Sequence, residues 1–225
     1  MRWLVLLVCV PLFGDPTVVS SDAARYDGEH IILRGHVHVE HEMGELFADR
    51  VTLTKDEEKQ TKLDFPWIKL EDDVRFVLVE GRKLICANAS CDYIKKQAYV
   101  EGGLHYSDQH GEIYARSGII DYIEEDKKLK PTRVTLEGEV QMVNQKRAQY
   151  ALADRVEYFP EKELMVMTAQ KSVLFYDKER GMELSAKEVR ARRDADGQDT
   201  VQGVGNVRFL FGAGEFEKLQ GKFGL

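Results

Sequence analysis

The sequence predicts an all-β fold in which antiparallel hairpins are stacked around one continuous core. Apolar and polar residues alternate from Leu33 to Glu40, which is the period of a strand with one buried and one solvated face. An apolar pair of this kind recurs six times, at steps of 37, 30, 36, 33 and 34 residues. Such a period is typical of hairpins that share a core with their neighbours. We therefore expect one elongated domain over residues 24–225, built from about six repeats.

The N-terminal segment differs in character from the rest of the chain. Eleven consecutive apolar residues, Trp3 to Phe13, follow the first two residues, and a small, polar run then ends near Ala24. A membrane-spanning helix needs roughly 20 apolar residues, so this segment is too short to be one. The pattern predicts a secretory signal peptide over residues 1–23, cleaved near Ala23 or Ala24.

The first recurring feature is a pair of apolar residues two positions apart, on one face of a strand. In four of the six copies a glycine stands two positions before the pair, where a strand can bend or bulge. Asp72 and Lys171 take that place in the other two copies. The pairs are Val37/Val39, Val74/Phe76, Leu104/Tyr106, Val140/Met142, Val173/Phe175 and Val207/Phe209.

The second recurring feature follows the pair about thirteen residues later. It is a small residue, then an apolar residue three positions on and another five positions on, as in Ala48, Val51 and Leu53. On a flat strand the three-residue step would put the first two side chains on opposite faces. We therefore predict a bulge or kink after the small residue. The other copies are Asn88/Cys91/Tyr93, Ser117/Ile120/Tyr122, Ala153/Val156/Tyr158 and Ala186/Val189/Ala191.

The segments between these features are short and contain glycine, asparagine and charged residues, as hairpin turns do. The stretch from Leu184 to Arg193 is ambiguous, because its charges and alanines are also compatible with a helix. Its fit to the second feature favours a strand.

The charge of the chain argues against a nucleic-acid partner. The 32 Lys and Arg residues stand against 39 Asp and Glu, which gives a net charge of -7. The positive residues are spread along the chain, whereas a nucleic-acid-binding protein gathers them on one face. We therefore expect no nucleic-acid binding.

Cysteine and histidine provide two candidate sites of special chemistry. Cys86 and Cys91 lie about 16 Å apart on a continuous strand, so they can form a disulfide only if the chain kinks between them. Two free, half-buried thiols explain the pair equally well. His36 and His38 share one face of a strand and could contribute to a metal site. The polar face of a half-exposed strand explains them without a metal, and we predict none.

No arrangement of residues in the sequence predicts an enzyme. Gly203 and Gly205 begin like a dinucleotide-binding loop, but Arg208 stands where the third glycine belongs and no helix pattern follows. No serine lies in a Gly-x-Ser-x-Gly motif, and paired acids fall at turns. We predict no catalytic residues and no cofactor.

The apolar pairs, together with Leu33 and Leu136, form a stripe that runs the length of the stack. Buried apolar residues are usually packing, so the plain interpretation is a filled core. The alternative is an open groove whose lining binds a lipid. The candidate lipid-binding residues are Leu33, Val37, Val39, Val74, Phe76, Leu104, Tyr106, Leu136, Val140, Met142, Val173, Phe175, Val207 and Phe209.

The chain resembles the OstA-like family, the periplasmic lipopolysaccharide-transport proteins that include LptA, LptC and the N-terminal domain of LptD. The resemblance lies in ILRGHVHV (residues 32–39) and ADRV (48–51), echoed by LEGEV (136–140) and ADRVEY (153–158). It covers nearly all of the chain from about Arg25 to Phe211. The family fold is an open, twisted β-jelly roll whose members join end to end.

This resemblance implies a periplasmic carrier that holds the acyl chains of lipopolysaccharide in its apolar interior and helps to bridge the inner and outer membranes. Its partners would be lipopolysaccharide and other bridge proteins, bound through terminal strand edges, with possible head-to-tail self-association. The cleavable-looking signal favours an LptA-like component over an LptC-like subunit. Two further alternatives are a structural or adhesive β-repeat protein without a lipid, and a periplasmic metal-binding module built on the histidines.

Overall fold

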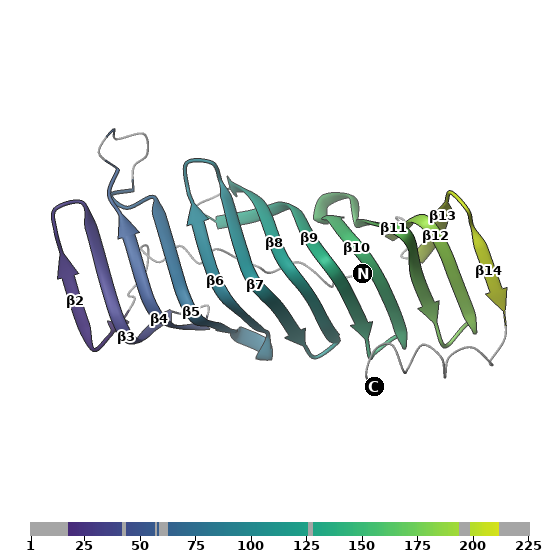
Figure 1. The fold of residues 1–225 in the computed structure, drawn as a ribbon, viewed down its shortest axis with the longest axis horizontal. Coiled ribbons are helices and arrows are strands. Elements are labelled where there is room, and N and C mark those ends of the chain that lie inside the picture. Colours follow the sequence, from purple (N-terminus) through teal and green to yellow (C-terminus); the bar gives the residue numbers. More distant parts are fainter. Residues whose placement is uncertain are drawn as a thin grey trace.

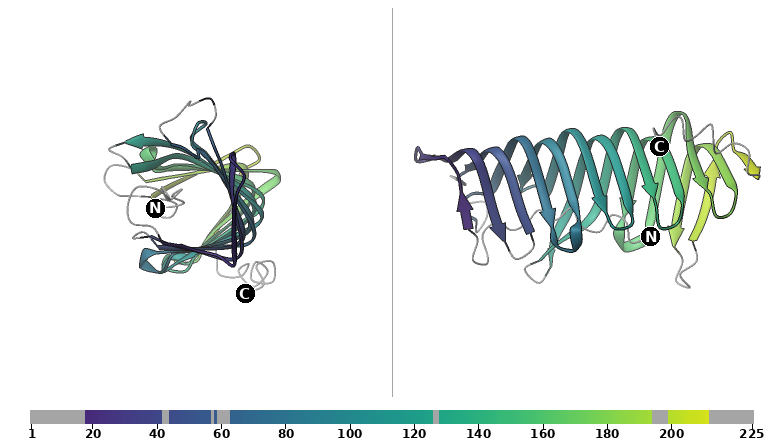
Figure 2. Two further views of the ribbon diagram at one scale, coloured as in Figure 1. Left: turned by 90° about the vertical axis from the view of Figure 1, so that its left-hand side faces the viewer. Right: turned by 90° about the horizontal axis from the view of Figure 1, so that it is seen from below.

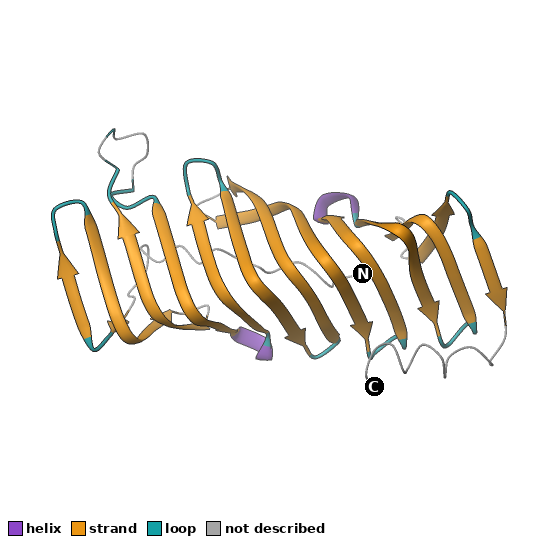
Figure 3. Ribbon diagram, in the orientation of Figure 1, coloured by secondary structure: helices purple, strands orange, loops and turns teal. Residues whose placement is uncertain are grey.

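The structure, a computed structural model, describes residues 18–41, 44–56, 58, 63–125, 128–193 and 199–211. These residues form one antiparallel sheet of 14 strands with two short 3₁₀ turns (Figures 1 and 3). Most of the predicted signal peptide lies outside the described residues. The elements are β1 (Val18–Ser20), β2 (Ala23–Tyr26), β3 (His30–His41), β4 (Gly44–Thr54), β5 (Trp67–Leu78), η1 (Val79–Gly81), β6 (Lys83–Asp92), β7 (Gln97–Asp108), β8 (Gly111–Glu125), β9 (Lys128–Asn144), β10 (Gln149–Phe159), η2 (Pro160–Lys162), β11 (Leu164–Asp177), β12 (Met182–Arg193), β13 (Asp199–Val204) and β14 (Arg208–Phe211).

The strands follow one another through the sheet in chain order, each antiparallel to the next, from β3 to β13. At one end β1 and β2 both pair with β3, and at the other end β13 and β14 both pair with β12. Seen end-on, the strands form a curved wall, and no described strand closes its open side (Figure 2). The predicted all-β stack of antiparallel hairpins is therefore confirmed, including a strand over Leu184 to Arg193.

Each long strand bends at a corner and contributes one segment to each of two arms. The first arm contains β1, β14 and strand halves such as 37–41 of β3 and 140–144 of β9. The second arm contains β2, β13 and the opposite halves, such as 30–34 of β3. Successive hairpin turns therefore fall alternately at the tip of the first arm and at the tip of the second. Side chains on the inner faces of the two arms form one core.

Two consecutive residues in the left-handed region form most of the corners. At the first corner Gly35 has φ 73° and His36 has φ 48°, and one residue of β4, Asp49, faces the two. The register of β3 and β4 shifts there, between Arg34 and Val37. Similar left-handed pairs occur at 72–73, 102–103, 138–139 and 205–206.

The corner explains the odd three-residue step of the second feature. Ala48, Val51 and Leu53 are 4%, 2% and 6% exposed, so all three reach the core, as predicted. The prediction is wrong for Asn88 and Ser117, the small residues of the second and third copies, because Cys86 and Ala115 take the buried place opposite the apolar pair. The kink lies after the small residue, as expected, but the extra residues belong to the neighbouring strands β3 and β5. β4 bends between two bulges.

The fifth corner is built differently. Between Thr168 and Val173 of β11, four residues face the single Lys187 of β12. Lys171 is not among the residues with positive φ. The amide N–H of Gln170 instead donates to Oδ2 of Asp154 at 2.6 Å. Without a glycine, the chain makes this corner as a wider bulge held by a side chain of the preceding hairpin.

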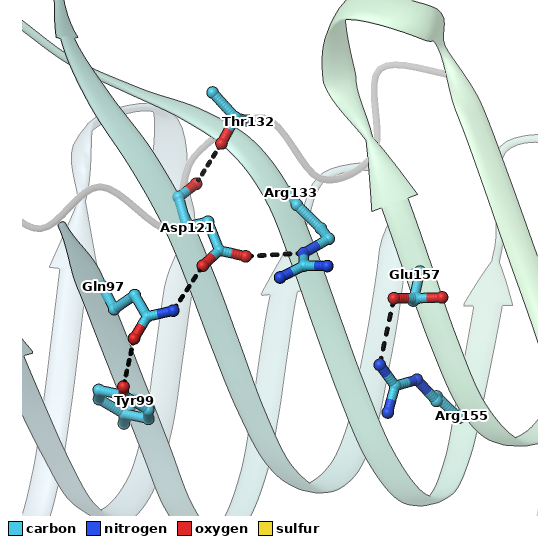
Figure 4. Close-up of polar contacts among 7 residues, drawn as sticks. All are labelled: Gln97, Tyr99, Asp121, Thr132, Arg133, Arg155 and Glu157. Carbon is cyan, nitrogen blue, oxygen red and sulfur yellow. Dashed lines mark hydrogen bonds and ion pairs between the residues drawn. The ribbon is translucent and has the colours of Figure 1, made fainter. Parts of the chain in front are cut away.

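The outer face of the roll carries a network of exposed and partly buried polar contacts (Figure 4). Asp121 on β8 accepts hydrogen bonds from Gln97 Nε2 at 2.8 Å and from Arg133 Nε at 2.7 Å. Arg155 donates to Glu157 at 3.1 Å. Exposed ion pairs contribute about 0–1 kcal/mol each, so this network marks the solvated face rather than holding the fold together. Among the described residues no helix is long and apolar enough to cross a membrane.

Candidate functional site

The interior face of the roll places the predicted apolar pairs in two layers. In the first five pairs the first member stands next to the corner and is the more deeply buried, as in Val37, Val74 and Val173, which are at most 1% exposed. The second members, such as Val39 and Phe175, lie nearer the tip of the first arm. The two layers follow from the strand period of two residues. Each inward-facing side chain lies farther from the corner, and nearer the open side, than the inward-facing one before it. Leu104, Leu136 and Val140 are also in the buried core.

The first pocket lies between the two arms in the N-terminal half of the roll. It measures about 820 Å³, including space open to solvent. Val39 and Phe76 contribute to its lining from the first arm. The apolar residues opposite them on the second arm are Ile68, Leu70, Ala89, Ala98, Val100 and Ile120.

The second pocket lies in the C-terminal half and measures about 500 Å³, again including open space. Met142 and Phe175 line it from the first arm, and Met165 and Met167 line it from the second. Unbranched methionine side chains adapt readily to a flexible apolar ligand. The candidate residues Val39, Phe76, Met142 and Phe175 thus line pockets, whereas the first members of the pairs, next to the corner, line neither pocket.

Val207 and Phe209 differ from the other pairs, because each is 43% exposed. Phe209 on β14 pairs with Leu184, which is fully buried, so both side chains belong to the interior face. The Val207 side chain lies over Gly203, because a Cβ atom on that glycine would be 2.9 Å from Cγ1 of Val207. These two residues are exposed because β13 and β14 end the described sheet, so no further described hairpin covers them.

A polar residue stands two positions beyond several of the apolar pairs and closes the hairpin at the tip of the first arm. Oδ1 of Asp108 accepts the amide N–H groups of His110 and Gly111 at 2.7 and 3.0 Å. Asn144 and Asp177 accept the amide N–H groups of Arg147 and Arg180 in the same way, at 2.9 and 3.1 Å. Such side-chain turns supply a polar rim directly above an apolar wall.

An ion pair joins the two arms at the open side of the second pocket. Arg147, in the turn between β9 and β10, lies at the tip of the first arm and pairs through Nη1 with Oδ2 of Asp199 at the tip of the second. Asp199 also accepts from Arg193 Nε at 3.1 Å. Asp199 itself lines the pocket. Two guanidinium groups therefore share one carboxylate at the rim.

Burial keeps the Cys86 thiol and the Tyr106 hydroxyl uncharged. Desolvation raises the pKa of the Cys86 thiol to about 12, so the thiolate is scarce at neutral pH. Desolvation, followed by the charge of Asp108, also raises the pKa of Tyr106. Neither of these two groups therefore adds charge to the apolar interior.

The cysteines and histidines form no special site among the residues that the structure describes. No disulfide joins Cys86 and Cys91, and Cys91 Sγ lies 3.4 Å from the hydroxyl of Tyr122. His36 lies at the corner beside Asp22, whereas His38 stacks on Phe47 with ring centroids 4.5 Å apart. No group of three metal-ligating side chains occurs in the described parts of the chain.

Sequence reasoning missed the pocket wall contributed by the second arm. Ile68, Leu70, Val100 and Ile120 line the first pocket, but only Ile120 belongs to either recurring feature. The other three alternate with polar residues in their own strands, so the period of two would have identified them as inward-facing. That they face Phe76 across the pocket depends on the bend at the corner.

Comparisons with known proteins identify the family of the chain. The family model described as "LptA/(LptD N-terminal domain) LPS transport protein" matches residues 18–196. Among solved structures, the chain matches LptH from Pseudomonas aeruginosa, described as the LptA-homologous periplasmic component of the lipopolysaccharide transport device. The identity is 12%, the match covers 88% of this chain and 96% of that chain, and the TM-score is 0.23. No curated protein sequence matches. The family match spans most of the chain, which therefore belongs to the LptA/LptD N-terminal family of lipopolysaccharide-transport proteins.

Proposed function

We propose that this protein carries lipopolysaccharide through the periplasm as an LptA-like component of the transport bridge, with the acyl chains in the groove between the two arms. The observation that supports this most is the pair of apolar pockets on the inner face, which remain open on one side of the roll. Moving an acyl chain from water into such a lining is favourable by about 0.8 kcal/mol per methylene. The sugars and phosphates can stay at the open side.

The two layers of the interior divide the candidate residues into two roles. Phe76, Met142 and Phe175 would contact acyl chains, because they line pockets. Val37, Val74 and Val173 would hold the corner and support these residues without reaching the lipid, because they are at most 1% exposed. At the C-terminal end, Val207 and Phe209 would contact lipid as it enters or leaves the groove.

The strand edges at the two ends of the roll support end-to-end contacts with other bridge proteins, or with further copies of this chain. β1 and β2 form one edge, and β13 and β14 form the other. Edge strands carry unpaired backbone groups that can pair with a strand from a neighbour. Cleavage near Ala23 or Ala24 would remove β1 and expose residues 38–40 of β3 as part of the edge.

Site-specific photo-crosslinking tests the proposal. A photoreactive residue at Phe76 or Phe175 should capture lipopolysaccharide, because both side chains line pockets. Arg75 and Gln141 serve as matched controls, since each lies one position from an inward-facing residue and points to the opposite face. Equal capture at the inner and outer positions, or no capture at any, would refute lipid transport in this groove.

A further inference from the structure

Three arginines lie near one another at the rim of the second pocket, in a chain whose net charge is -7. Arg147 stands three positions after Asn144, and Arg180 stands three positions after Asp177. Both lie in turns at the tip of the first arm. Arg193 ends β12 on the second arm. The side chains of Arg147 and Arg193 are 32% and 24% exposed, so both are accessible from the open side.

The guanidinium groups are incompletely neutralised. Arg147 and Arg193 share the single carboxylate of Asp199. Burial, and then the charges of Arg193 and Arg180, lower the pKa of Arg147, and the carboxylates of Glu179 and Asp177 offset this only in part. A phosphate carries more negative charge than a carboxylate, so in the place of Asp199 it would offset more of the repulsion between the arginines.

Asn144 supplies a further polar group at the same rim. It lies two positions beyond Met142, which lines the pocket, so its side chain belongs to the interior face. The side chain is 1% exposed, and its Nδ2 has no hydrogen-bond partner among the described residues. A buried donor without an acceptor is costly, which points to a ligand oxygen that completes it.

We propose that Arg147 and Arg193 bind the phosphate of an amphiphile whose acyl chains occupy the second pocket, and that this phosphate displaces the carboxylate of Asp199. The proposal rests on the proposed function and assigns one part of the ligand to one end of the groove. Arginine presents paired donors that match phosphate oxygens, and the apolar wall of Met142, Phe175 and Met165 begins beside them. While no lipid is bound, Asp199 forms ion pairs with both arginines, and its pair with Arg147 joins the two arms.

The first pocket provides an internal control. The carboxylate in its lining, Glu45 at the tip of the first arm, pairs with His38 at 3.1 Å, whereas Asp199 in the lining of the second pocket pairs with two arginines. A phosphate that displaced Glu45 would therefore meet a histidine rather than two guanidinium groups. Capture in the first pocket should therefore depend on acyl chains alone.

The experiment places a photoreactive residue at Phe175 or at Phe76 and compares diphosphorylated lipid A with the same lipid treated with phosphatase. Combining Arg147→Gln with Arg193→Gln should lower capture of the phosphorylated lipid at Phe175 about tenfold, since each charge-assisted contact is strong. Capture at Phe76, and capture of the phosphatase-treated lipid at Phe175, should be unchanged. Arg133→Gln with Arg155→Gln, on the outer face, is the matched control and should have no effect.

Asp199→Asn gives the opposite prediction, because it removes the competing carboxylate. Capture of the phosphorylated lipid at Phe175 should increase while circular dichroism and capture at Phe76 stay unchanged. Inorganic phosphate alone should show no binding by calorimetry, because it lacks the chains that fill the pocket. Phosphate binding that equals lipid binding would overturn a lipid-specific site.

The outcomes separate the two proposals. If the unmodified protein captures neither lipid at either position, lipid transport itself fails. If it captures both but the two arginine substitutions change nothing, or weaken both lipids equally, only the phosphate site is overturned.

Discussion

Gly102 and Ala87 approach each other so closely at the third corner that a Cβ atom on Gly102 would lie 2.5 Å from the Cβ of Ala87. Gly103, the next residue, has open space around it, although its φ of 89° is equally left-handed. The two glycines therefore separate the cost of backbone strain from the cost of a clash.

Gly102→Ala should destabilise the protein more than Gly103→Ala does. Both substitutions place an L residue in the left-handed region, at about 1–2 kcal/mol each, but only the first adds overlap worth another ~1–3 kcal/mol. Urea unfolding of the two variants measures the difference. Equal losses would mean that the corner relaxes and the contact with Ala87 is unimportant.

A second prediction concerns pH. The side-chain hydrogen bond from His36 to Asp22, 2.8 Å long, and then the charge of Asp22, raise the pKa of His36. Because the folded state holds this proton more tightly, the stabilisation is present at low pH and is lost as pH rises through the pKa of folded His36. The effect is small because both side chains are exposed.

An NMR titration of the His36 ring checks this. In the full chain its pKa should exceed the ordinary histidine value, and in a chain that begins at Ala24 it should fall back, because Asp22 is absent. The charge of Asp49 raises the pKa of His36 less than Asp22 does, and Asp49 is present in both chains. An unchanged titration after the truncation would contradict the pairing.

A third prediction compares a buried residue of β12 with its exposed partner on the terminal strand β14. Leu184→Ala removes a side chain that is fully buried and should cost about 2–5 kcal/mol. Phe209→Ala removes a larger side chain from the same face but should cost less, since Phe209 is 43% exposed. Chemical denaturation of both variants decides the order, and a larger loss at Phe209 would show that the C-terminal end is covered in solution.

The fourth prediction uses the two thiols. In a Cys9→Ser chain, Cys91 should react with iodoacetamide before Cys86, because burial raises the pKa of Cys86 to about 12. Cys91 also lines the first pocket, so bound lipopolysaccharide should slow its alkylation. Mass spectrometry of the native and urea-unfolded protein gives both rates. Faster labelling of Cys86 in the native state would contradict its burial.

The sequence was sufficient to predict the stack and its inner face, because a period of two identifies the buried side of each strand regardless of what it faces. The corner was recognisable at Gly35, Gly102, Gly138 and Gly205. At Asp72 the same left-handed pair forms without glycine, which no local pattern reveals. The wider bulge at Lys171 depends on Asp154 of the preceding hairpin.

The candidate groove was predictable only in part. Phe76, Met142 and Phe175 belong to the recurring pairs, whereas the opposite wall requires knowledge of how sharply the strands bend. The sequence could not reveal the pairing of Arg147 with Asp199, because these residues are distant in the chain and meet only across the open side. The exposure of Val207 and Phe209 reflects where the described sheet ends rather than any property of those residues.

The ordered pairing of each strand with its neighbours makes the molecule a one-dimensional array. In such an array, stability is close to a sum of contributions from each hairpin and from each junction between hairpins. Fraying should begin at the two ends and stop at the first well-packed junction. The length of the roll can therefore change by whole hairpins without altering the geometry at its middle.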